Sequence, residues 1–352
     1  MRWQPAWSTR RHWQHPTDNA AMKLPQLALI GTGGTIAGAA AHAASSTRYQ
    51  PASLGIEAVA QSVPELQARY RLKLFQPLQL GSYDVTPEHW LKLHQVVSEA
   101  LADPETCGAV ITHGTDTLEE TATFLSLSVA NDKPVVVIGA MRPATAHSAD
   151  GPANVLDACT VAAHPQAVGR GALVVMNGRI HAGLWVTKRH VSSVEAFDSP
   201  LAGALGEVAD QSVRWFGPAH RCAPLPGRLP DVLPRVEIAV SYAGADDTAL
   251  KALVAAGARG IVHAGLGNAN APAGNRAYLR DLPAQGVALL RCARWIPGTV
   301  TRNSSMFDDD ALGSLTAGTL PPHKARIALM LGLSQGLSTQ DLQAWLDRIN
   351  AH

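Results

Sequence analysis

The amino-acid sequence predicts an α/β protein. We expect a larger N-terminal domain, in which a mostly parallel sheet carries helices on both faces, and a smaller C-terminal α/β domain. The chain has 352 residues, which indicates two domains at about 100–200 residues each. Short apolar runs alternate with stretches of helical periodicity, a pattern typical of a parallel sheet whose two faces are both covered. Hydrophobic residues make up 46% of the chain, enough for a sizeable core.

The chain begins with a segment, residues 1–23, that we expect to be a disordered extension. Its first 22 residues lack the continuous apolar run of a secretory signal, and we interpret Met22 as the natural start. The N-terminal domain is predicted over residues 24–215.

The expected strands and helices follow in order. Apolar runs predict strands at 27–30, 109–112, 134–138, 172–176, 236–240, 260–262 and 287–290. Helical patterns lie at 88–101, 118–129 and 248–256, and an amphipathic helix is expected near 341–349. Residues 216–234 contain five prolines, which lack the backbone N–H and fix φ, so we expect a linker there. The second domain is predicted over residues 235–352.

Charge and cysteine content narrow the classes of function. The 29 Lys and Arg residues nearly balance the 28 Asp and Glu residues, so no nucleic-acid partner is expected. No apolar run reaches the length of about 18 residues that a membrane span needs, so no membrane partner is expected either. The 4 cysteines form no CxxC pair, which argues against a zinc site and favours reduced thiols in a cytoplasmic protein.

The first candidate site is the glycine-rich turn LIGTGGTIAG at 29–38, which directly follows the first predicted strand. A dinucleotide loop needs G-x-G-x-x-G, but Ile36 stands at the last glycine position. A P-loop fails as well, because no Gly-Lys-Ser/Thr follows. Thr32 and Thr35 remain, and a threonine hydroxyl at a strand end is a candidate nucleophile. A plain turn explains this segment equally well.

Further polar turns follow other predicted strands. The block THGTDTLEET at 112–121 brings Thr115 and Asp116 to the edge where parallel sheets bind ligands. A helix start explains an acidic residue and a hydroxyl there, but not the whole block. The turn GAMRP at 139–143 follows the next strand. Lys188 becomes a candidate general base if burial beside a threonine and an aspartate lowers its pKa.

Together these blocks resemble the bacterial-type L-asparaginase/glutaminase-asparaginase family. TGGTIA at 32–37 and HGTDTLEET at 113–121 match the two diagnostic motifs of that family in order and spacing. Shorter matches lie at 139–143, 148–152, 186–188, 267–270, 318–320 and 324–326. The resemblance covers about residues 24–350. It implies hydrolysis of the side-chain amide of L-asparagine through a threonine acyl-enzyme, with L-glutamine as a second substrate and with no cofactor or metal ion.

The resemblance also implies a set of catalytic residues. Thr35 matches the nucleophile, and Tyr49 matches a tyrosine on a mobile lid loop that assists proton transfer to and from that threonine. Thr115, Asp116 and Lys188 match a second catalytic set, in which lysine and aspartate polarise the threonine. The resemblance implies that Thr115 and Asp116 also bind the substrate, and that Asp116 binds its α-ammonium group. This division fits the chemistry, since an alcohol at its free pKa is a weak nucleophile and needs a base.

The implied substrate-binding residues include two departures from the family pattern. Ser82 matches the serine that holds the substrate α-carboxylate, and Ala140 matches a residue whose backbone carbonyl faces the amide. Asn270 matches an asparagine donated by a neighbouring subunit, so a homotetramer with shared sites is implied. Tyr83 replaces the usual Gln or Glu, and the neighbour's glutamate has only Ser305 as a loose positional equivalent. Both changes touch substrate recognition and leave the preference between asparagine and glutamine open.

Two other classes of function stay open. A non-catalytic amino-acid sensor on the same scaffold is suggested by Tyr83 and the missing glutamate, and it would bind asparagine or aspartate without turnover. A nucleotide-binding α/β oxidoreductase is suggested only by the glycine-rich first loop, and absence of NAD binding would exclude it. The cysteine pair that cross-links some periplasmic family members is absent, because Cys107 has no partner near Asn131. That absence supports the cytoplasmic expectation.

Overall fold

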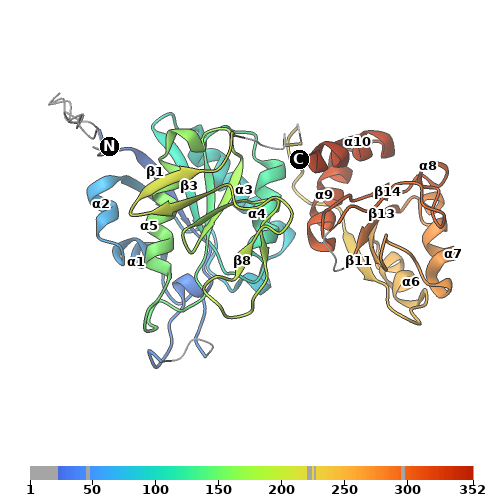
Figure 1. The fold of residues 1–352 in the computed structure, drawn as a ribbon, viewed down its shortest axis with the longest axis horizontal. Helices are drawn as coiled ribbons and strands as arrows, with labels where there is room; N and C mark the ends of the chain where they lie inside the picture. The colour runs from blue at the N-terminus through green and yellow to red at the C-terminus, as the bar shows by residue number, and fades with distance from the viewer. Residues whose placement is uncertain (1–22, 45–47, 220–223, 226, 295–297, 352) are drawn as a thin grey trace, which may run out of the picture.

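The structure is a computed structural model that describes residues 23–44, 48–219, 224–225, 227–294 and 298–351. The expected disordered extension lies outside the described residues apart from Lys23, and so does Met22. The strands form two main sheets, one built from the first part of the chain and one from the last part, and a separate two-stranded pair (Figure 1). None of the helices in the described part is both long and apolar enough to cross a membrane.

The larger sheet has eight strands in the order β10-β9-β6-β5-β4-β3-β1-β2. Five of them pair in parallel: β1 (Gln26–Gly31), β2 (Arg71–Phe75), β3 (Thr106–Thr112), β4 (Val135–Ile138) and β5 (Ala172–Met176). Three antiparallel strands extend the sheet: β6 (Arg179–Ala182), β9 (Gly206–Ala209) and β10 (Ser212–Trp215). The two-stranded pair β7 (Thr187–Lys188) and β8 (Phe197–Asp198) stands apart from it.

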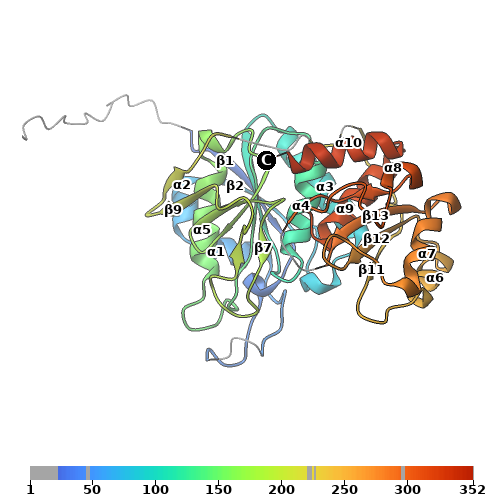
Figure 2. The ribbon, with the colours of Figure 1, turned by 45° about the vertical axis from the view of Figure 1, so that its right-hand side comes forward.

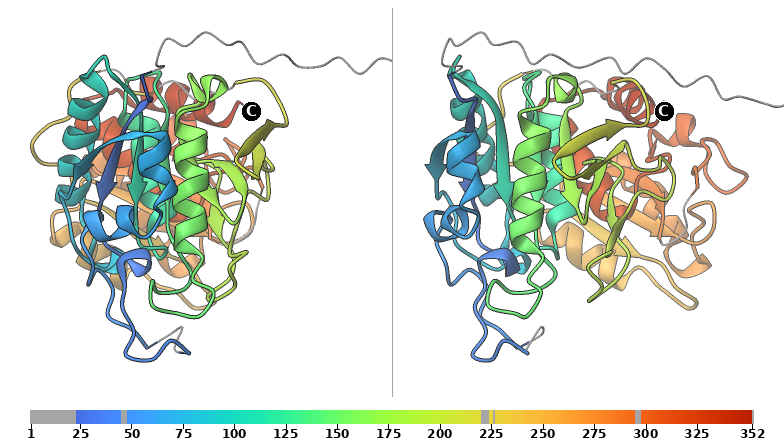
Figure 3. Two further views of the ribbon diagram at one scale, coloured as in Figure 1. Left: turned by 90° about the vertical axis from the view of Figure 1, so that its left-hand side faces the viewer. Right: turned by 60° about the vertical axis from the view of Figure 1, so that its left-hand side comes forward.

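Both faces of the larger sheet are buried. In β1, Leu27 and Leu29 belong to one buried cluster, while Ala28 and Ile30 belong to another, because side chains alternate along a strand. The first cluster includes α1 (Ile56–Gln61), α2 (Glu65–Arg69) and α5 (Gly151–Ala162). The second includes α3 (Pro87–Ala102) and α4 (Leu118–Ser128). Figure 3 shows α5 running along one face of the sheet. The predicted fold class is confirmed.

The smaller sheet has the parallel order β11-β12-β13-β14. Its strands are β11 (Val236–Val240), β12 (Gly260–Gly265), β13 (Ala288–Ala293) and β14 (Leu315–Thr316). Its helices are α6 (Thr248–Ala255), α7 (Ala273–Asp281), α8 (Asp309–Leu312), α9 (Pro322–Ser334) and α10 (Thr339–Asn350). Figures 1 and 2 show α4 and α9 side by side, and one buried cluster continues from α4 into α9. The two sheets therefore share apolar core across this helix pair.

The antiparallel strands were not expected from the sequence. The turn between β5 and β6 is Asn177-Gly178, both with positive φ (51° and 72°), which is the geometry of a tight two-residue hairpin. The predicted linker, 216–234, lies between β10 and β11, with 220–223 and 226 outside the described residues. Within it the Leu225 amide donates to the Leu127 carbonyl at 2.9 Å. The predicted domain boundaries stay a prediction.

Candidate active site

The candidate site lies where parallel strands of the larger sheet end. In the sheet register Gly31 at the end of β1 is paired with Thr112 at the end of β3, and Thr112 is paired with Ile138 at the end of β4. The turns that follow these ends therefore meet at one edge, the usual ligand-binding edge of an α/β sheet. They carry Thr35, Thr115 and Ala140. The dark-blue loop that follows β1 projects from this edge in Figure 3.

Two glycines let the turns after β1 and β3 touch. Gly34 has φ of 80°, a left-handed conformation that favours glycine. A Cβ on Gly34 would lie 2.3 Å from both Cα and N of Gly114. The close approach of these two backbones is therefore possible only without a side chain at position 34. It brings the segments with Thr35 and Thr115 together.

Thr35 is buried at the start of a short 3-10 helix, η1 (Thr35–Ala37). Its Oγ1 forms a hydrogen bond of 2.6 Å with the hydroxyl of Tyr49. The loop that carries Tyr49 is closed at its base by paired backbone hydrogen bonds between Ala39 and Gln50, at 3.0 and 2.9 Å. The tyrosine ring also packs on Gly38, where a Cβ would lie 2.8 Å from Cδ2 of the ring. The hydroxyl of Thr35 thus has a neighbour that can pass or accept a proton.

The second cluster joins Thr115, Asp116 and Lys188. Lys188 Nζ donates to Thr115 Oγ1 at 2.9 Å and to Asp116 Oδ1 at 2.8 Å. The lysine side chain is 16% exposed and the aspartate side chain is 56% exposed, while Thr115 is buried. The ammonium is thus largely withdrawn from water and held by a carboxylate that still faces solvent.

Ser82 links the second cluster to the loop after β2. Ser82 is buried in η2 (Ser82–Asp84), and its Oγ accepts a hydrogen bond from the Asp116 amide at 3.1 Å. Its backbone carbonyl accepts from Thr117 Oγ1 at 2.7 Å. Tyr83 is 64% exposed, and its ring lies over Gly81, where a Cβ would be 2.5 Å from Cζ. Ser82 therefore lies inside the cluster, whereas Tyr83 faces away from the core.

The turn after β4 has its own support. Asp150 accepts hydrogen bonds from the backbone amides of Met141 and Arg142, both at 2.9 Å. Asn154 donates to the Gly139 carbonyl at 3.0 Å. Ala140 lies between these anchors and is completely buried. Its place in the turn is therefore held from both sides.

Both halves of the chain match known family models. A model described as "Asparaginase, N-terminal" matches residues 26–221, and one described as "Glutaminase/Asparaginase C-terminal domain" matches residues 235–346. The chain belongs to the asparaginase family.

Individual relatives agree with this assignment. A glutaminase-asparaginase of Pseudomonas fluorescens biotype A is 41% identical over 325 residues, covering 91% of this chain and 90% of that protein. A Haemophilus influenzae protein named "Probable L-asparaginase periplasmic" is 39% identical over 331 residues, with 93% and 94% covered. The crystal structure of a protein named "Probable Cytoplasmic L-asparaginase" from Campylobacter jejuni matches with a TM-score of 0.87 at 34% identity, covering 92% of this chain and 99% of that one.

Within the described residues, Asn270 forms no hydrogen bond to the candidate site of its own chain. Asn270 follows β12 and exchanges backbone hydrogen bonds with Leu266, at 2.9 and 2.7 Å. Among the described residues, no hydrogen bond connects it to either threonine loop. Ser305, expected from the resemblance as the loose equivalent of a neighbour's glutamate, is exposed. No group of three or more His, Cys, Asp or Glu side chains in the described ranges is placed to hold a metal ion.

His113 supports the loop that carries Thr115. It is buried and its ring nitrogens contact the Gly114 carbonyl at 2.7 Å and Thr121 Oγ1 at 2.9 Å. Burial lowers the pKa of His113 to about 4, although the Gly114 carbonyl acts in the opposite direction. The imidazole is therefore neutral near pH 7 and orders the loop before Thr115.

Sequence reasoning missed several residues that hold the loops. Asp150 lies in the match at 148–152 and Asn154 lies just after it, but nothing local shows that they bond back to the GAMRP turn. A second group joins α4 to α9: Glu119, His323 and Lys324. Lys324 belongs to the KAR match at 324–326, which supported the family resemblance but assigned no role to Lys324.

Proposed function

We propose that this asparaginase hydrolyses the side-chain amide of L-asparagine to L-aspartate and ammonia, with L-glutamine as a secondary substrate. The observation that carries the proposal is the convergence of two threonine loops, each with a proton-transfer partner. Thr35 is bonded to Tyr49 at 2.6 Å, and Thr115 is bonded to Lys188 at 2.9 Å. The family membership supports the same reaction.

In the first half of the reaction, Thr35 Oγ1 attacks the amide carbon. A C–O bond forms, the hydroxyl proton leaves toward Tyr49, and the C–N bond breaks as the nitrogen takes up a proton and departs as ammonia. In the second half, water attacks the resulting ester, and the proton that it loses returns to Thr35. Positioned proton transfer of this kind contributes about 10²–10⁴-fold to rate.

The second cluster binds the substrate and shares in proton transfer. Asp116, the more exposed partner of Lys188, is the carboxylate for the substrate α-ammonium. Ser82 Oγ is the hydroxyl for the α-carboxylate, with Tyr83 beside it and the Ala140 carbonyl facing the amide. The Lys188 ammonium polarises the Thr115 hydroxyl, to which it donates.

We propose further that the protein is a homotetramer whose sites are shared between subunit pairs. Asn270 of a neighbouring subunit then completes each site, because the described residues contain no hydrogen bond between Asn270 and the site of the same chain. Light scattering at micromolar concentration should give four times the 37.1 kDa chain mass, and a monomer that is fully active would contradict this. Asn270→Ala should raise KM more than it lowers kcat.

We place the protein in the cytoplasm. Free thiols at Cys107, Cys159 and Cys292 support this location, and Cys222 lies outside the described residues. The Campylobacter jejuni protein is named cytoplasmic, while the Haemophilus influenzae protein is named periplasmic. Fractionation of native cells decides the location, and release with the periplasmic fraction would overturn it.

Side-by-side kinetics of ammonia release from asparagine and glutamine test the proposed activity. We expect turnover of asparagine by the wild type and loss of several orders of magnitude in kcat for Thr35→Ala. Thr32→Val is a matched control, because Thr32 Oγ1 donates to the Thr112 carbonyl at 2.8 Å and the proposed mechanism gives it no part. Undiminished activity of Thr35→Ala would refute the mechanism, and saturable binding without turnover by the wild type would indicate a sensor.

A further inference from the structure

A buried group of charges joins the C-terminal helix α9 to the start of α4. Glu119 Oε2 lies 3.1 Å from His323 Nε2 and 3.7 Å from Lys324 Nζ. The Lys324 side chain is 1% exposed and the Glu119 side chain is 11% exposed. Charged side chains are rarely buried this deeply without partners. Apolar packing of α4 on α9 does not by itself call for buried charges, which points to something else that these charged side chains hold in place.

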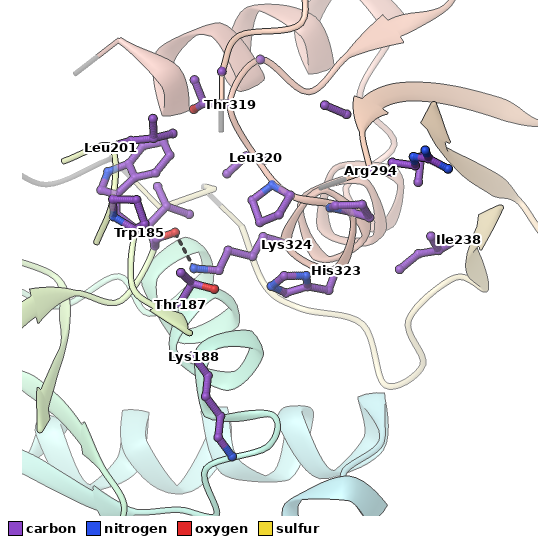
Figure 4. Close-up of a pocket in the computed structure, with 18 of the residues that line it drawn as sticks. Trp185, Thr187, Lys188, Leu201, Ile238, Arg294, Thr319, Leu320, His323 and Lys324 are labelled. Carbon is purple, nitrogen blue, oxygen red and sulfur yellow. Dashed lines mark hydrogen bonds between the residues drawn. The ribbon is translucent and has the colours of Figure 1, made fainter. Parts of the chain in front are cut away.

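The same group holds the backbone of the segment that leads to Lys188. Lys324 Nζ donates to the Leu184 carbonyl at 2.9 Å and also to the Val186 carbonyl. Glu119 Oε1 accepts from the backbone amide of Lys188 at 3.3 Å. Figure 4 shows Lys324 reaching from α9 to the segment that carries Trp185, Thr187 and Lys188, with a hydrogen bond drawn at its Nζ. Two carbonyls of this segment, those of Leu184 and Val186, and the amide of Lys188 thus bond to a single ion pair.

Glu119 lies close in sequence to the other partners of Lys188. It stands three residues after Asp116, in the first turn of α4. One carboxylate therefore contacts the Lys188 backbone, while the neighbouring loop supplies the acceptors of the Lys188 side chain, Thr115 Oγ1 and Asp116 Oδ1. The lysine is held at its backbone and at its tip by groups on the same short stretch.

The electrostatics keep the pair charged. Burial lowers the pKa of Lys324 to about 8, and Glu119 opposes that shift. Burial raises the pKa of Glu119, but the hydrogen bond from His323 and the charge of Lys324 outweigh it and hold this pKa at about 2. Removing one member of such a pair leaves the other buried without its partner.

We propose that Glu119, His323 and Lys324 are positioning residues that set Lys188 Nζ at Thr115 and Asp116. The C-terminal α9 thereby fixes the geometry of a catalytic cluster that the N-terminal sheet carries. This inference rests on the proposed function. The C-terminal part of each chain then positions Lys188 in the site of the same chain, in addition to contributing Asn270 to the site of a neighbouring subunit.

The consequence is a loss in kcat with little change in KM. Misplacement of a reacting group by about 1 Å can cost about 10²-fold in rate. Lys324→Met removes the donor to two carbonyls but keeps the length of the side chain, so we expect about a 10²-fold lower kcat. Lys324→Arg restores a cation and should recover part of that loss. Glu119→Gln keeps an acceptor for the Lys188 amide and should lose less than Lys324→Met.

Lys133→Met is the matched control. Lys133 Nζ also donates to two backbone carbonyls, those of Leu101 and Asp103, both at 2.8 Å. It lies before β4, at the end of the sheet opposite the candidate site. A general loss of stability would affect both variants, whereas a positioning effect would lower kcat only for Lys324→Met.

A double-mutant cycle decides the inference. The kcat for ammonia release from saturating asparagine is measured for the wild type, Lys324→Met, Lys188→Met and the double variant, with thermal unfolding to show that each is folded. If Lys324 acts through Lys188, its replacement costs little further kcat once Lys188 is gone, because the two effects are not additive. An equal fold-loss in both backgrounds, or a kcat for Lys324→Met equal to that of Lys133→Met, would overturn it.

Failure of the proposed function and failure of the positioning role give different results. If Lys324→Met does not fold, Glu119→Gln takes its place in the same cycle. If the wild type releases no ammonia from asparagine or glutamine, the proposed function fails. If the wild type is active and the cycle is additive, only the positioning role fails.

Discussion

A single methyl group at Gly114 should disable the site, because Gly114 lies between three of its loops. A Cβ at this position would be 2.6 Å from Ser82 Oγ, 2.8 Å from Ser82 Cβ and 3.1 Å from Gly34 Cα. Ordinary van der Waals contact begins at 3.4 Å, so the Ser82 atoms must move by about 0.6 to 0.8 Å. Rotation of the Ser82 hydroxyl cannot relieve the contact with its Cβ. The loops of Ser82 and Thr35 must therefore separate from that of Thr115.

The expected result for Gly114→Ala is a kcat about 10²-fold below that of the wild type, since a misplacement of about 1 Å can cost that much. Overpacking should also lower the free energy of unfolding by about 1–3 kcal/mol. The assay is ammonia release from asparagine, with urea unfolding in parallel. Gly217→Ala is the control, because a Cβ there would meet nothing within 4 Å. Wild-type kcat in Gly114→Ala would refute the view that these loops must touch for activity.

The remaining predictions concern the Tyr49 hydroxyl and stability at low pH. Tyr49→Phe removes the group 2.6 Å from Thr35 Oγ1 and should lower kcat about 10²–10⁴-fold with little change in KM; unchanged kcat would remove Tyr49 from the proton path. Burial lowers the pKa to about 4 at three histidines: His113, His181 and His263. As the pH falls from 7 to 5, these histidines take up protons in the unfolded chain before they do so in the folded protein. The free energy of unfolding should therefore fall over this range. Once a histidine is protonated in the unfolded chain, the loss is about 1.4 kcal/mol per pH unit for that histidine. Burial raises the pKa of Asp157 to about 6, so the folded protein takes up one proton before the unfolded chain does. This single proton raises the free energy of unfolding on acidification and so opposes the effect of the histidines. Urea unfolding at the two pH values measures the balance, and a flat or rising free energy on acidification would contradict it.

Several strands of the two sheets could be predicted because they are short and mostly apolar. The run predicted at 236–240 coincides with β11, and the run at 172–176 coincides with β5. In contrast, β2 reads RLKLF and lies at the sheet edge, where polar residues interrupt the apolar run. The hairpin after β5 had a local signal in Asn177-Gly178, but its second strand, β6, reads RIHA and lacks an apolar run.

Without the family resemblance, which named Tyr49 and Ser82, the sequence indicates candidate site residues mainly where a polar motif follows a predicted strand. Thr35 and Thr115 both follow strands, and parallel neighbours end at one edge. Ser82 could not be linked to Asp116 by spacing, because η2 brings it there across 34 positions of the chain. The pair of Glu119 and Lys324 is farther apart still and depends on how α9 packs on α4. Such contacts are set by tertiary packing and leave no local periodicity.

The most direct test of the central claim, that Thr35 is the nucleophile of an acyl-enzyme, is mass spectrometry of enzyme quenched in acid during turnover of asparagine. We expect an added aspartyl group on the peptide that contains Thr35, and its loss in Thr35→Ala. The adduct should persist on Thr35 in Thr115→Val, since that hydroxyl belongs to the cluster of Lys188. Turnover with the aspartyl group on Thr115 instead, or an adduct that survives in Thr35→Ala, would contradict the account.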